Sequence, residues 1–406
     1  MNDLTPADEA GVAEAVKAAA TDAVSLELVG GGSLEGFGRP VQAGRTLRLR
    51  QLRGIPLYRP SELVIRALAG TPVGEVVDAL DAEGQALPFE PPDLRHLLGN
   101  DDAEPTIGGL VAANLSGPAR ISRGALRDSL IGVRFVDGQG RIQRSGGRVM
   151  KNVTGLDLVK LQAGAHGTLG ALTEVTFKVL PRSETQSTLL VGGLDAAAAS
   201  RVMARAMASP LDVSAAAYLP PDVAARSVVA ELAGRDDGVV ALRLDTFASF
   251  LPERLRKLRQ HVAAAGATDV LEDQASGTLW GEIRDVRLLT HPLDRAVWRI
   301  STAASNGPRL LVSLATDMDG RGFADWSGGL LWLAVAATDD AGAGAIRAAV
   351  DAVGGHATLV RAPLAIRAAV DVFHPEAPRL AALTRSVKAA VDPQGIVNPG
   401  RMYAGL

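Results

Sequence analysis

Three glycine-rich stretches are the first candidates for chemistry in this sequence, and the first of them is Gly30-Gly31-Gly32-Ser33. It directly follows the short apolar run Leu26–Val29, which reads as a strand. Glycines after a strand let several backbone N–H groups converge on one point, a geometry that binds phosphate oxygens, and Ser33 adds a hydroxyl donor. A glycine-rich turn without a ligand explains the stretch equally well, since it matches neither a P-loop nor GxGxxG.

The second stretch, residues 105–117 (PTIGGLVAANLSG), is small, apolar and uncharged. Small side chains let a backbone approach a large planar ligand closely, and Asn114 and Ser116 offer directed hydrogen bonds. The alternative is a buried Ala/Gly-rich helix packed tightly on a neighbour.

The third stretch places Gly164, Gly167 and Gly170 at every third position before a strand. In that strand Val175 and Phe177 alternate with polar residues, the period of a half-buried strand. A glycine-studded turn of this kind can present backbone amides to an anionic or planar ligand, but it also suits a tight connection in any α/β domain.

The elements around these stretches alternate between helices and strands. Thr5 is a predicted N-cap for a first helix, and Thr71 is a predicted N-cap for a second one that follows a strand at residues 62–68. Alternation at residues 131–135, followed by Asp-Gly and a return at 141–142, predicts a hairpin. This order is typical of an α/β domain.

Beyond Pro181 the pattern changes to Ala-rich amphipathic helices and apolar strands. Helices are predicted at residues 196–208 and 252–265, and strands at residues 239–244 and Leu330–Val335. These alternating elements indicate a second, α+β domain.

Composition limits the possible functions. A chain of 406 residues with 47% apolar residues predicts two domains with buried cores. Its Lys and Arg residues are dispersed and its net charge is −3, which argues against a nucleic-acid partner. Without cysteine, the chain cannot form a disulfide or ligate an iron–sulfur cluster through its own thiolates. The acidic N-terminus lacks the form of a signal peptide, and no uncharged run approaches the ~20 residues of a membrane span, so we expect a cytoplasmic protein.

Taken together, the motifs resemble a known family. The triple glycine after a strand, Thr106-Ile107-Gly108-Gly109 with Ala113-Asn114-Leu115-Ser116-Gly117, and Gly167-Thr168-Leu169-Gly170 before a strand resemble, in this order, the vanillyl-alcohol-oxidase (PCMH-type) FAD-binding family. Over nearly the whole chain the sequence resembles the E subunits of bacterial glycolate oxidases. The motifs that carry this second resemblance are Val149-Met150-Lys151-Asn152-Val153-Thr154-Gly155, Glu90-Pro91-Pro92, Gly354-Gly355-His356-Ala357-Thr358 and Asn398-Pro399-Gly400-Arg401-Met402-Tyr403-Ala404.

The resemblance implies an α+β protein: a PCMH-type FAD-binding domain of two α/β subdomains at residues 1–182 and a smaller α+β domain at 183–385. A C-terminal segment at 386–406 is expected to pack back on the FAD-binding domain.

The resemblance also implies a set of FAD-binding residues. The first loop would wrap the pyrophosphate, the second stretch would line the ribityl and isoalloxazine region, and the third would form a wall beside the flavin. These residues are Gly30, Gly31, Gly32, Ser33, Leu34, Pro105, Thr106, Gly108, Gly109, Ala113, Asn114, Ser116, His166, Gly167, Thr168, Leu169, Gly170, Ala171 and Leu172.

Two positions depart from relatives. His166 stands where many relatives carry Glu, and either a ligand contact or a solvated turn residue is compatible with it. Relatives with covalent flavin carry a histidine near the first loop, where this chain has Leu34-Glu35-Gly36, so FAD is expected to bind non-covalently.

No catalytic residue can be named from the sequence. Relatives that oxidise 2-hydroxy acids carry closely spaced metal-binding histidines, whereas the nearest two of the six histidines here, His356 and His374, are 18 positions apart. His356 is a candidate base or a structural histidine, and Arg361 and Arg367 are candidate carboxylate ligands or solvated surface residues.

The resemblance therefore favours an electron-relay or accessory FAD subunit of a glycolate-oxidising complex. Its expected partners are a catalytic FAD subunit and an iron–sulfur subunit, one of which could hold the complex at a membrane, and its substrate through the complex is glycolate. Two alternatives stay open: a free-standing FAD oxidase of another alcohol or 2-hydroxy acid, and a non-catalytic assembly subunit.

Overall fold

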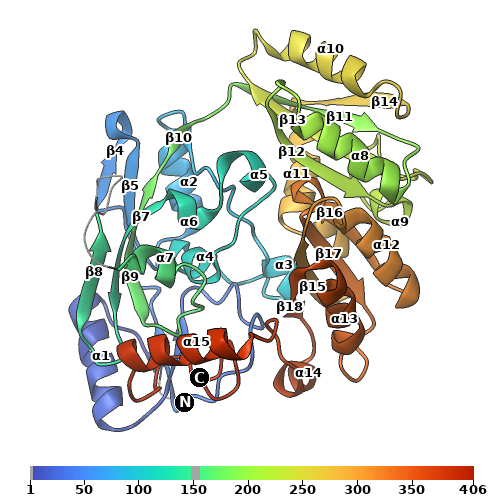
Figure 1. Cartoon of the computed structure of the whole chain (residues 1–406). Coiled ribbons are helices and arrows are strands. Elements are labelled where there is room, and N and C mark those ends of the chain that lie inside the picture. Colours follow the sequence, from blue (N-terminus) through green and yellow to red (C-terminus); the bar gives the residue numbers. More distant parts are fainter. Residues whose placement is uncertain (1–2, 148–155) are drawn as a thin grey trace.

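The computed structural model describes residues 3–147 and 156–406. Figure 1 shows two parts side by side, an N-terminal part that holds strands β1–β10 and a C-terminal part that holds strands β11–β18. The motif at residues 149–155, which supports the E-subunit resemblance, lies outside the described residues.

A small parallel sheet carries the first glycine loop. Its order is β1-β3-β2, with β1 at Asp3–Leu4, β2 at Leu26–Val29 and β3 at Arg45–Arg48. Helix α1 (Glu9–Thr21) packs its apolar face on this sheet. Its N-cap is Asp8, whose Oδ1 accepts a hydrogen bond from the backbone N–H of Gly11 at 2.8 Å, so the predicted cap at Thr5 is wrong.

A five-stranded antiparallel sheet forms the rest of the N-terminal core, in the order β4-β5-β9-β7-β8. The predicted hairpin is confirmed as β7 with β8, and the predicted strand after the third glycine stretch is confirmed as β9. The bounds are β4 Leu57–Arg59, β5 Val64–Leu68, β7 Leu130–Val136, β8 Ile142–Gly146 and β9 Ala171–Lys178.

Short helices and a two-stranded ribbon connect these strands. The N-cap of helix α2 is Pro72. The hydroxyl of Thr71 does not cap this helix, because it accepts the backbone N–H of Gly54 and donates to the carbonyl of Gly54, each at 3.0 Å. The predicted cap at Thr71 is therefore wrong. The bounds are α2 Val73–Asp81, α3 Arg95–Leu98, α4 Ile107–Ala113, α5 Arg120–Arg123, α6 Leu126–Ser129, α7 Leu158–Gln162, β6 Gln85–Ala86 and β10 Leu180–Pro181.

An eight-stranded antiparallel sheet organises the C-terminal part, in the order β14-β11-β13-β12-β16-β17-β15-β18. The predicted strand Leu330–Val335 is β17, and all of its residues are buried. The other bounds are β11 Thr185–Val191, β12 Val213–Leu219, β13 Val239–Thr246, β14 Thr268–Glu272, β15 Ala296–Thr302, β16 Arg321–Asp325 and β18 Gly355–Arg361.

Helices pack on this sheet, where α8, α10, α12 and α13 contact strands β12, β11, β16 and β18 respectively. The two predicted helices are confirmed as α8 and α10. The bounds are α8 Ala196–Met207, α9 Pro221–Ala224, α10 Leu251–Val262, α11 Asp273–Arg284, α12 Gly307–Asp317, α13 Ala343–Val353 and α14 Leu364–Ala369, with a 3-10 turn η3 at Trp326–Gly328.

The C-terminal segment returns to the N-terminal part. After helix α15 (Pro378–Val391), Val397 forms a parallel bridge with Leu26 of β2. Figure 1 shows α15 and the chain's C-terminus beside the N-terminal part, near the N-terminus. None of the helices in the described ranges is long and apolar enough to cross a membrane.

Candidate functional site

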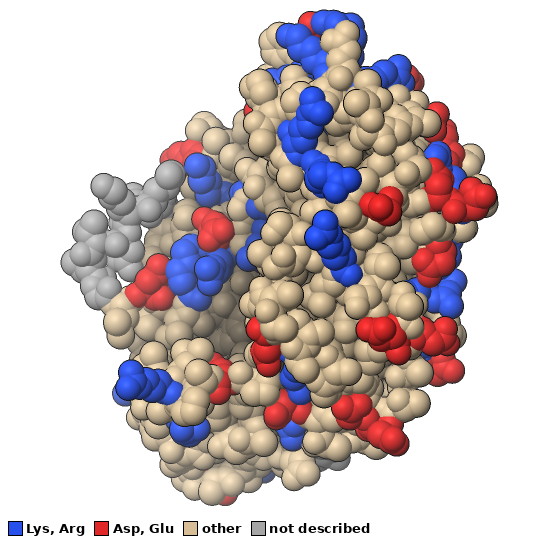
Figure 2. All heavy atoms as spheres, turned by 45° about the vertical axis from the view of Figure 1, so that its right-hand side comes forward, with Lys and Arg blue, Asp and Glu red and all other residues tan. Residues whose placement is uncertain are grey.

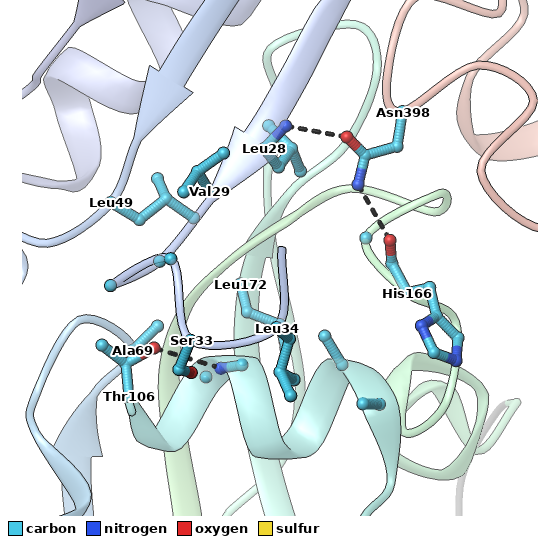
Figure 3. Close-up of a pocket in the computed structure, with 18 of the residues that line it drawn as sticks. Leu28, Val29, Ser33, Leu34, Leu49, Ala69, Thr106, His166, Leu172 and Asn398 are labelled. Atoms are coloured by element: carbon cyan, nitrogen blue, oxygen red, sulfur yellow. Dashed lines mark hydrogen bonds between the residues drawn. The ribbon is translucent and has the colours of Figure 1, made fainter. Parts of the chain in front are cut away.

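The three glycine-rich motifs meet around one cavity of the N-terminal part (Figure 3). The first loop, helix α4 and the turn before β9 form its walls, and the C-terminal tail closes one side. The predicted residues that line it are Gly30, Gly31, Gly32, Ser33, Leu34, Thr106, Gly108, Gly109, Ala113, His166, Gly167, Gly170 and Leu172.

Close backbone contact with the second motif explains the glycines of the first loop. A Cβ atom on Gly31 would lie 1.8 Å from the carbonyl oxygen of Glu104, and one on Gly30 would lie 2.5 Å from Oγ1 of Thr106. The backbone N–H of Glu104 also donates to the carbonyl of Gly31 at 3.2 Å. Any side chain at position 31 would push the two motifs apart.

The N–H groups of this loop are available to a ligand. Within the described chain, the backbone N–H groups of Gly30, Gly31 and Gly32 donate to no other residue. Unpaired backbone donors beside a cavity fit an anionic group such as a pyrophosphate. Arg401 also lines the cavity, and Glu27, 3.6 Å away, is its ion-pair partner. The donors that fit a pyrophosphate are therefore mostly main-chain groups.

Helix α4 is a tightly packed helix, as one of the two interpretations of the second stretch predicts, and it also forms a wall of the cavity. A Cβ atom on Gly108 would lie 2.7 Å from the Cβ of Ala69, and the N–H of Gly108 donates to the carbonyl of Ala69 at 2.9 Å (Figure 3). Gly109 and Ala113 present a surface without bulky side chains to the cavity, as a planar ligand needs.

His166 belongs to the cavity wall, where it lies in a turn and is half-buried. Its ring makes edge contacts with Phe37 and Phe373, at centroid distances of 5.1 and 4.8 Å. Burial, followed by the positive charges of Arg401 and Arg299, lowers the pKa of His166 to about 3. The imidazole is therefore neutral at physiological pH, and it cannot replace the charge of a carboxylate at this position.

Comparison of the sequence with known proteins identifies the family of this chain. Residues 3–146 match the model of the FAD binding domain family FAD_binding_4. The chain is 35% identical to glycolate oxidase subunit GlcE of Escherichia coli over 393 residues, which cover 97% of both chains. The chain belongs to the glycolate oxidase E-subunit family. The chain is an FAD-linked oxidoreductase of this family.

More distant relatives share only a portion of the chain or only the fold. Glycolate oxidase subunit GlcD of Bacillus subtilis is 33% identical over 161 residues, which cover 39% of this chain and 33% of GlcD. Among solved structures, p-cresol methylhydroxylase has a TM-score of 0.73 at 13% identity, and the match covers 98% of this chain and 88% of that one. The 4-ethylphenol oxidase of Gulosibacter chungangensis has the same score and identity, with 99% and 89% coverage. The similarity to these structures shows that the chain has the PCMH-type fold.

Six residues of the expected flavin set are not among the residues that line the cavity of this E subunit. The amide oxygen of Asn114 accepts the N–H of Arg127 at 3.3 Å, and the hydroxyl of Ser116 accepts the N–H of Leu126 at 2.9 Å. Both side chains thus fix the chain that follows α4. The six residues are Pro105, Asn114, Ser116, Thr168, Leu169 and Ala171.

The C-terminal tail supplies a lining residue that the sequence did not assign to the site. The Oδ1 of Asn398 accepts the N–H of Leu28 at 2.7 Å, and its Nδ2 donates to the carbonyl of His166 at 2.8 Å (Figure 3). Asn398 therefore joins the strand before the first loop to the third motif. Its signal was present in the E-subunit tail motif, although the motif gave no reason to place it at the cavity. The other unassigned lining residues are Leu28, Val29, Glu35, Phe37, Leu49, Ala69, Ala112 and Arg401.

The candidate carboxylate ligands have structural roles. Arg361 is 7% exposed and donates to five backbone carbonyls, among them that of Leu97 at 2.9 Å. Arg367 donates to the carbonyls of Ala362 and Gly38 at 3.1 and 3.0 Å. Both arginines therefore hold neighbouring backbone segments together, and neither alternative, carboxylate ligand or solvated surface residue, describes them.

His356 lies near the start of β18, where it pairs with Ser301 of β15. Its side chain is exposed. Within residues 3–147 and 156–406, no group of three or more His, Cys, Asp or Glu side chains is arranged to hold a metal ion.

Proposed function

We propose that this E subunit holds FAD non-covalently in the cavity of the three motifs and relays electrons within a glycolate-oxidising complex. The observation that carries the proposal is the convergence of three sequence-distant glycine motifs on one cavity whose first loop keeps its backbone N–H groups free. FAD, when bound, supplies the electron-transfer chemistry.

Different segments of the chain would contact different parts of the cofactor. The loop from Gly30 to Leu34 would hold the pyrophosphate through backbone donors, and Thr106, Gly108, Gly109 and Ala113 would face the ribityl and ring region. The third motif, from His166 to Leu172, would form the remaining wall. Asn114 and Ser116 would support these segments through their hydrogen bonds to the chain after α4.

The relay role rests on the distribution of histidines and on the E-subunit family. The two histidines nearest in sequence, His356 and His374, do not form a closely spaced metal-binding pair. Instead, Nδ1 of His374 lies 3.3 Å from the N–H of Ala357, and its Nε2 lies 3.1 Å from the carboxylate of Asp351. Glycolate oxidation would then occur on a D-type flavin subunit. An iron–sulfur subunit would carry the electrons onward, because this chain has no cysteine. We place the chain in the cytoplasm, with any membrane contact made through a partner.

The test is purification of the native complex, followed by absorbance spectroscopy and identification of its subunits. We expect flavin absorbance in the isolated E subunit, release of all flavin into the supernatant on acid precipitation, and co-purification with the two partner subunits. Flavin that stays with the precipitated chain contradicts non-covalent binding. Reduction of the flavin of the isolated chain by glycolate contradicts the relay role.

A glycine variant tests the position of the cofactor. Gly31→Ala places a methyl group against the carbonyl of Glu104, so we expect FAD content to fall at least about tenfold, with stability lowered by about 1–3 kcal/mol. Gly74→Ala is the matched control, because a Cβ atom there meets nothing within 4 Å. Equal FAD content in the two variants, measured by absorbance, contradicts the proposed pyrophosphate loop.

A further inference from the structure

Helix α15 leaves large apolar side chains exposed to solvent. Leu380 and Leu383 are 51% and 59% exposed, whereas the one side chain of this helix that is buried is the charged Lys388. A surface helix ordinarily turns its apolar face toward the core. Figure 1 shows α15 on the outside of the N-terminal part. Exposed leucines grouped on such a helix mark a surface on which another molecule can pack.

The two leucines line a groove with a volume of about 310 Å³, which we call the α15 groove. It lies between α15, helix α7, the third glycine motif and the C-terminal tail. These elements contribute Leu161, which is also exposed, Leu169 and Met402 to its lining. The lining is thus mostly apolar, and part of it is open to water.

The ionic side chains of the groove are already engaged within the chain. Lys388 donates to the carboxylate of Asp392 and to two backbone carbonyls, and the carboxylate of Glu376 accepts the hydroxyl of Thr384 at 3.0 Å. A small polar ligand would have to compete with these contacts, whereas apolar side chains would gain by leaving water. The groove therefore suits the apolar side chains of another protein chain.

The charge of α15 selects among possible occupants. The helix contains no Asp or Glu, and its exposed Arg379 lies four positions before Leu383, on the same side of the helix. No carboxylate among the described residues forms an ion pair with Arg379. On the face of the molecule that Figure 2 shows, in contrast, Lys and Arg side chains lie among Asp and Glu side chains. A second copy of α15 would bring like charges together, so a partner with acidic side chains fits this surface better.

The α15 groove and the FAD cavity share the third glycine motif as a wall. Ala165, Thr168 and Leu169 line the groove, while His166 and Gly167 line the cavity. A chain seated in the groove would therefore contact the same turn that encloses the flavin. This position suits a protein that exchanges electrons with the flavin.

We propose that the α15 groove binds an amphipathic helix of a partner subunit. Apolar side chains of that helix would pack between α15 and α7, and one of its carboxylates would pair with Arg379. Apolar anchors in a groove, with charged residues at its rim, are the usual elements of helix recognition. Only the identification of the partner as a subunit of the glycolate-oxidising complex rests on the proposed function.

The test is co-expression of the full chain with the D-type and iron–sulfur subunits of its complex, followed by measurement of how much of each co-purifies. We expect Leu383→Glu to lower the retained amount at least about tenfold, because it places a negative charge in an apolar groove that faces an acidic partner. Leu364→Glu is the matched control, since Leu364 on α14 is 61% exposed and lies outside the groove lining. Equal retention by the two variants overturns the proposal.

Charge reversal on α15 tests the acidic character of the partner. We expect Arg379→Glu to lower partner retention at least about tenfold at low salt and Arg385→Glu to leave it unchanged. Both arginines are exposed, but Arg385 lies two positions after Leu383 and therefore points to another side of the helix. Equal retention by these two variants overturns the proposal. If the melting temperature shows that Leu383→Glu does not fold, this pair of variants decides.

Other occupants of the groove give different results. A wild-type chain that dimerises by itself, and that Leu383→Glu makes monomeric, would assign the groove to a second copy and overturn the proposal. Binding of the isolated chain to vesicles of anionic phospholipid that is lost in Leu383→Glu would overturn it as well.

FAD content is measured separately by absorbance. Loss of the partners from Leu383→Glu with wild-type FAD content supports the docking surface. A wild-type chain without FAD overturns the proposed function, and the comparison of partner retention then still decides about the groove.

Discussion

His166 shows how a single side chain can depart from its relatives and still fit the site. Its ring is held by Phe37 and Phe373, and its backbone is tied to the tail through Asn398. The φ of +49° at His166 is sustained by these contacts and by the hydrogen bond from its N–H to Ala112. A neutral imidazole thus forms this part of the cavity wall.

The lowered pKa of His166 predicts a pH-dependent stability. Between pH 6.5 and 3 the unfolded chain binds a proton at this position that the folded chain does not bind, so the free energy of unfolding falls as the pH is lowered through this range. His166→Gln removes this contribution. We expect its stability relative to the wild type to be about 1–2 kcal/mol more favourable at pH 5 than at pH 7. Urea unfolding at both pH values checks this, and an identical difference at both contradicts it.

At the scale of elements, the turn after α15 fixes the tail to the flavin-binding part. Lys388, 6% exposed, donates to the carboxylate of Asp392 at 2.6 Å and to the carbonyls of Thr168 and Val397 at 2.7 Å each. Asp392 also accepts the N–H of Val397 at 2.9 Å. The third glycine motif and the tail are therefore joined through one buried ion pair.

This pair predicts an asymmetry between single and double variants. Asp392→Asn leaves the ammonium of Lys388 buried without a counter-charge, so we expect a loss of about 3–5 kcal/mol in the free energy of unfolding. The double variant Lys388→Met with Asp392→Asn removes both charges and is expected to lose less. Urea unfolding measures both, and a larger loss in the double variant would mean that the charge pair itself is not what stabilises the turn.

At the scale of the whole molecule, a buried ion pair connects the two parts. Arg243 of β13 is 3% exposed and contacts Glu90, which belongs to the N-terminal part. The second oxygen of Glu90 accepts the N–H of Ala119 at 2.7 Å. Burial alone would raise the pKa of Glu90, but Arg243 and this hydrogen bond hold it below its ordinary value. The Glu-Pro-Pro motif of the E-subunit resemblance thus lies at the junction.

Removing this charge should weaken the coupling between the parts. We expect Glu90→Gln to lower the free energy of unfolding by about 2–4 kcal/mol, because among the described carboxylates Arg243 then keeps Asp245 alone as an ion-pair partner. The exposed variant Glu253→Gln is the control, with no measurable change expected.

Spectroscopy can locate the loss from Glu90→Gln. The four tryptophans (Trp280, Trp298, Trp326 and Trp332) all belong to the C-terminal part, so fluorescence reports that part and circular dichroism reports both. We expect coincident transitions in the wild type and separated ones in Glu90→Gln. Coincident transitions in both proteins would argue against this pair as the coupling.

Local elements and the motifs that carry the family resemblance can be predicted from the sequence. The strand Leu330–Val335 and the hairpin of β7 and β8 follow from side-chain periodicity, because alternation reflects the geometry of the strand itself. The residues that cap the helices were harder to predict from the sequence. Asp8 caps α1 in place of Thr5, and Thr71 bonds to Gly54, since several nearby polar groups compete for the same backbone donors.

Only the tertiary structure decided which distant residues share a site. Asn398 contacts Leu28 across 370 positions, and Arg120 and Arg299 each pack on the ring of Trp326. Such contacts have no period in the sequence, because they depend on how two sheets and a returning tail pack against one another. The glycines could be recognised from the sequence, but the carbonyl of Glu104 that makes Gly31 necessary is visible only once the chain is folded.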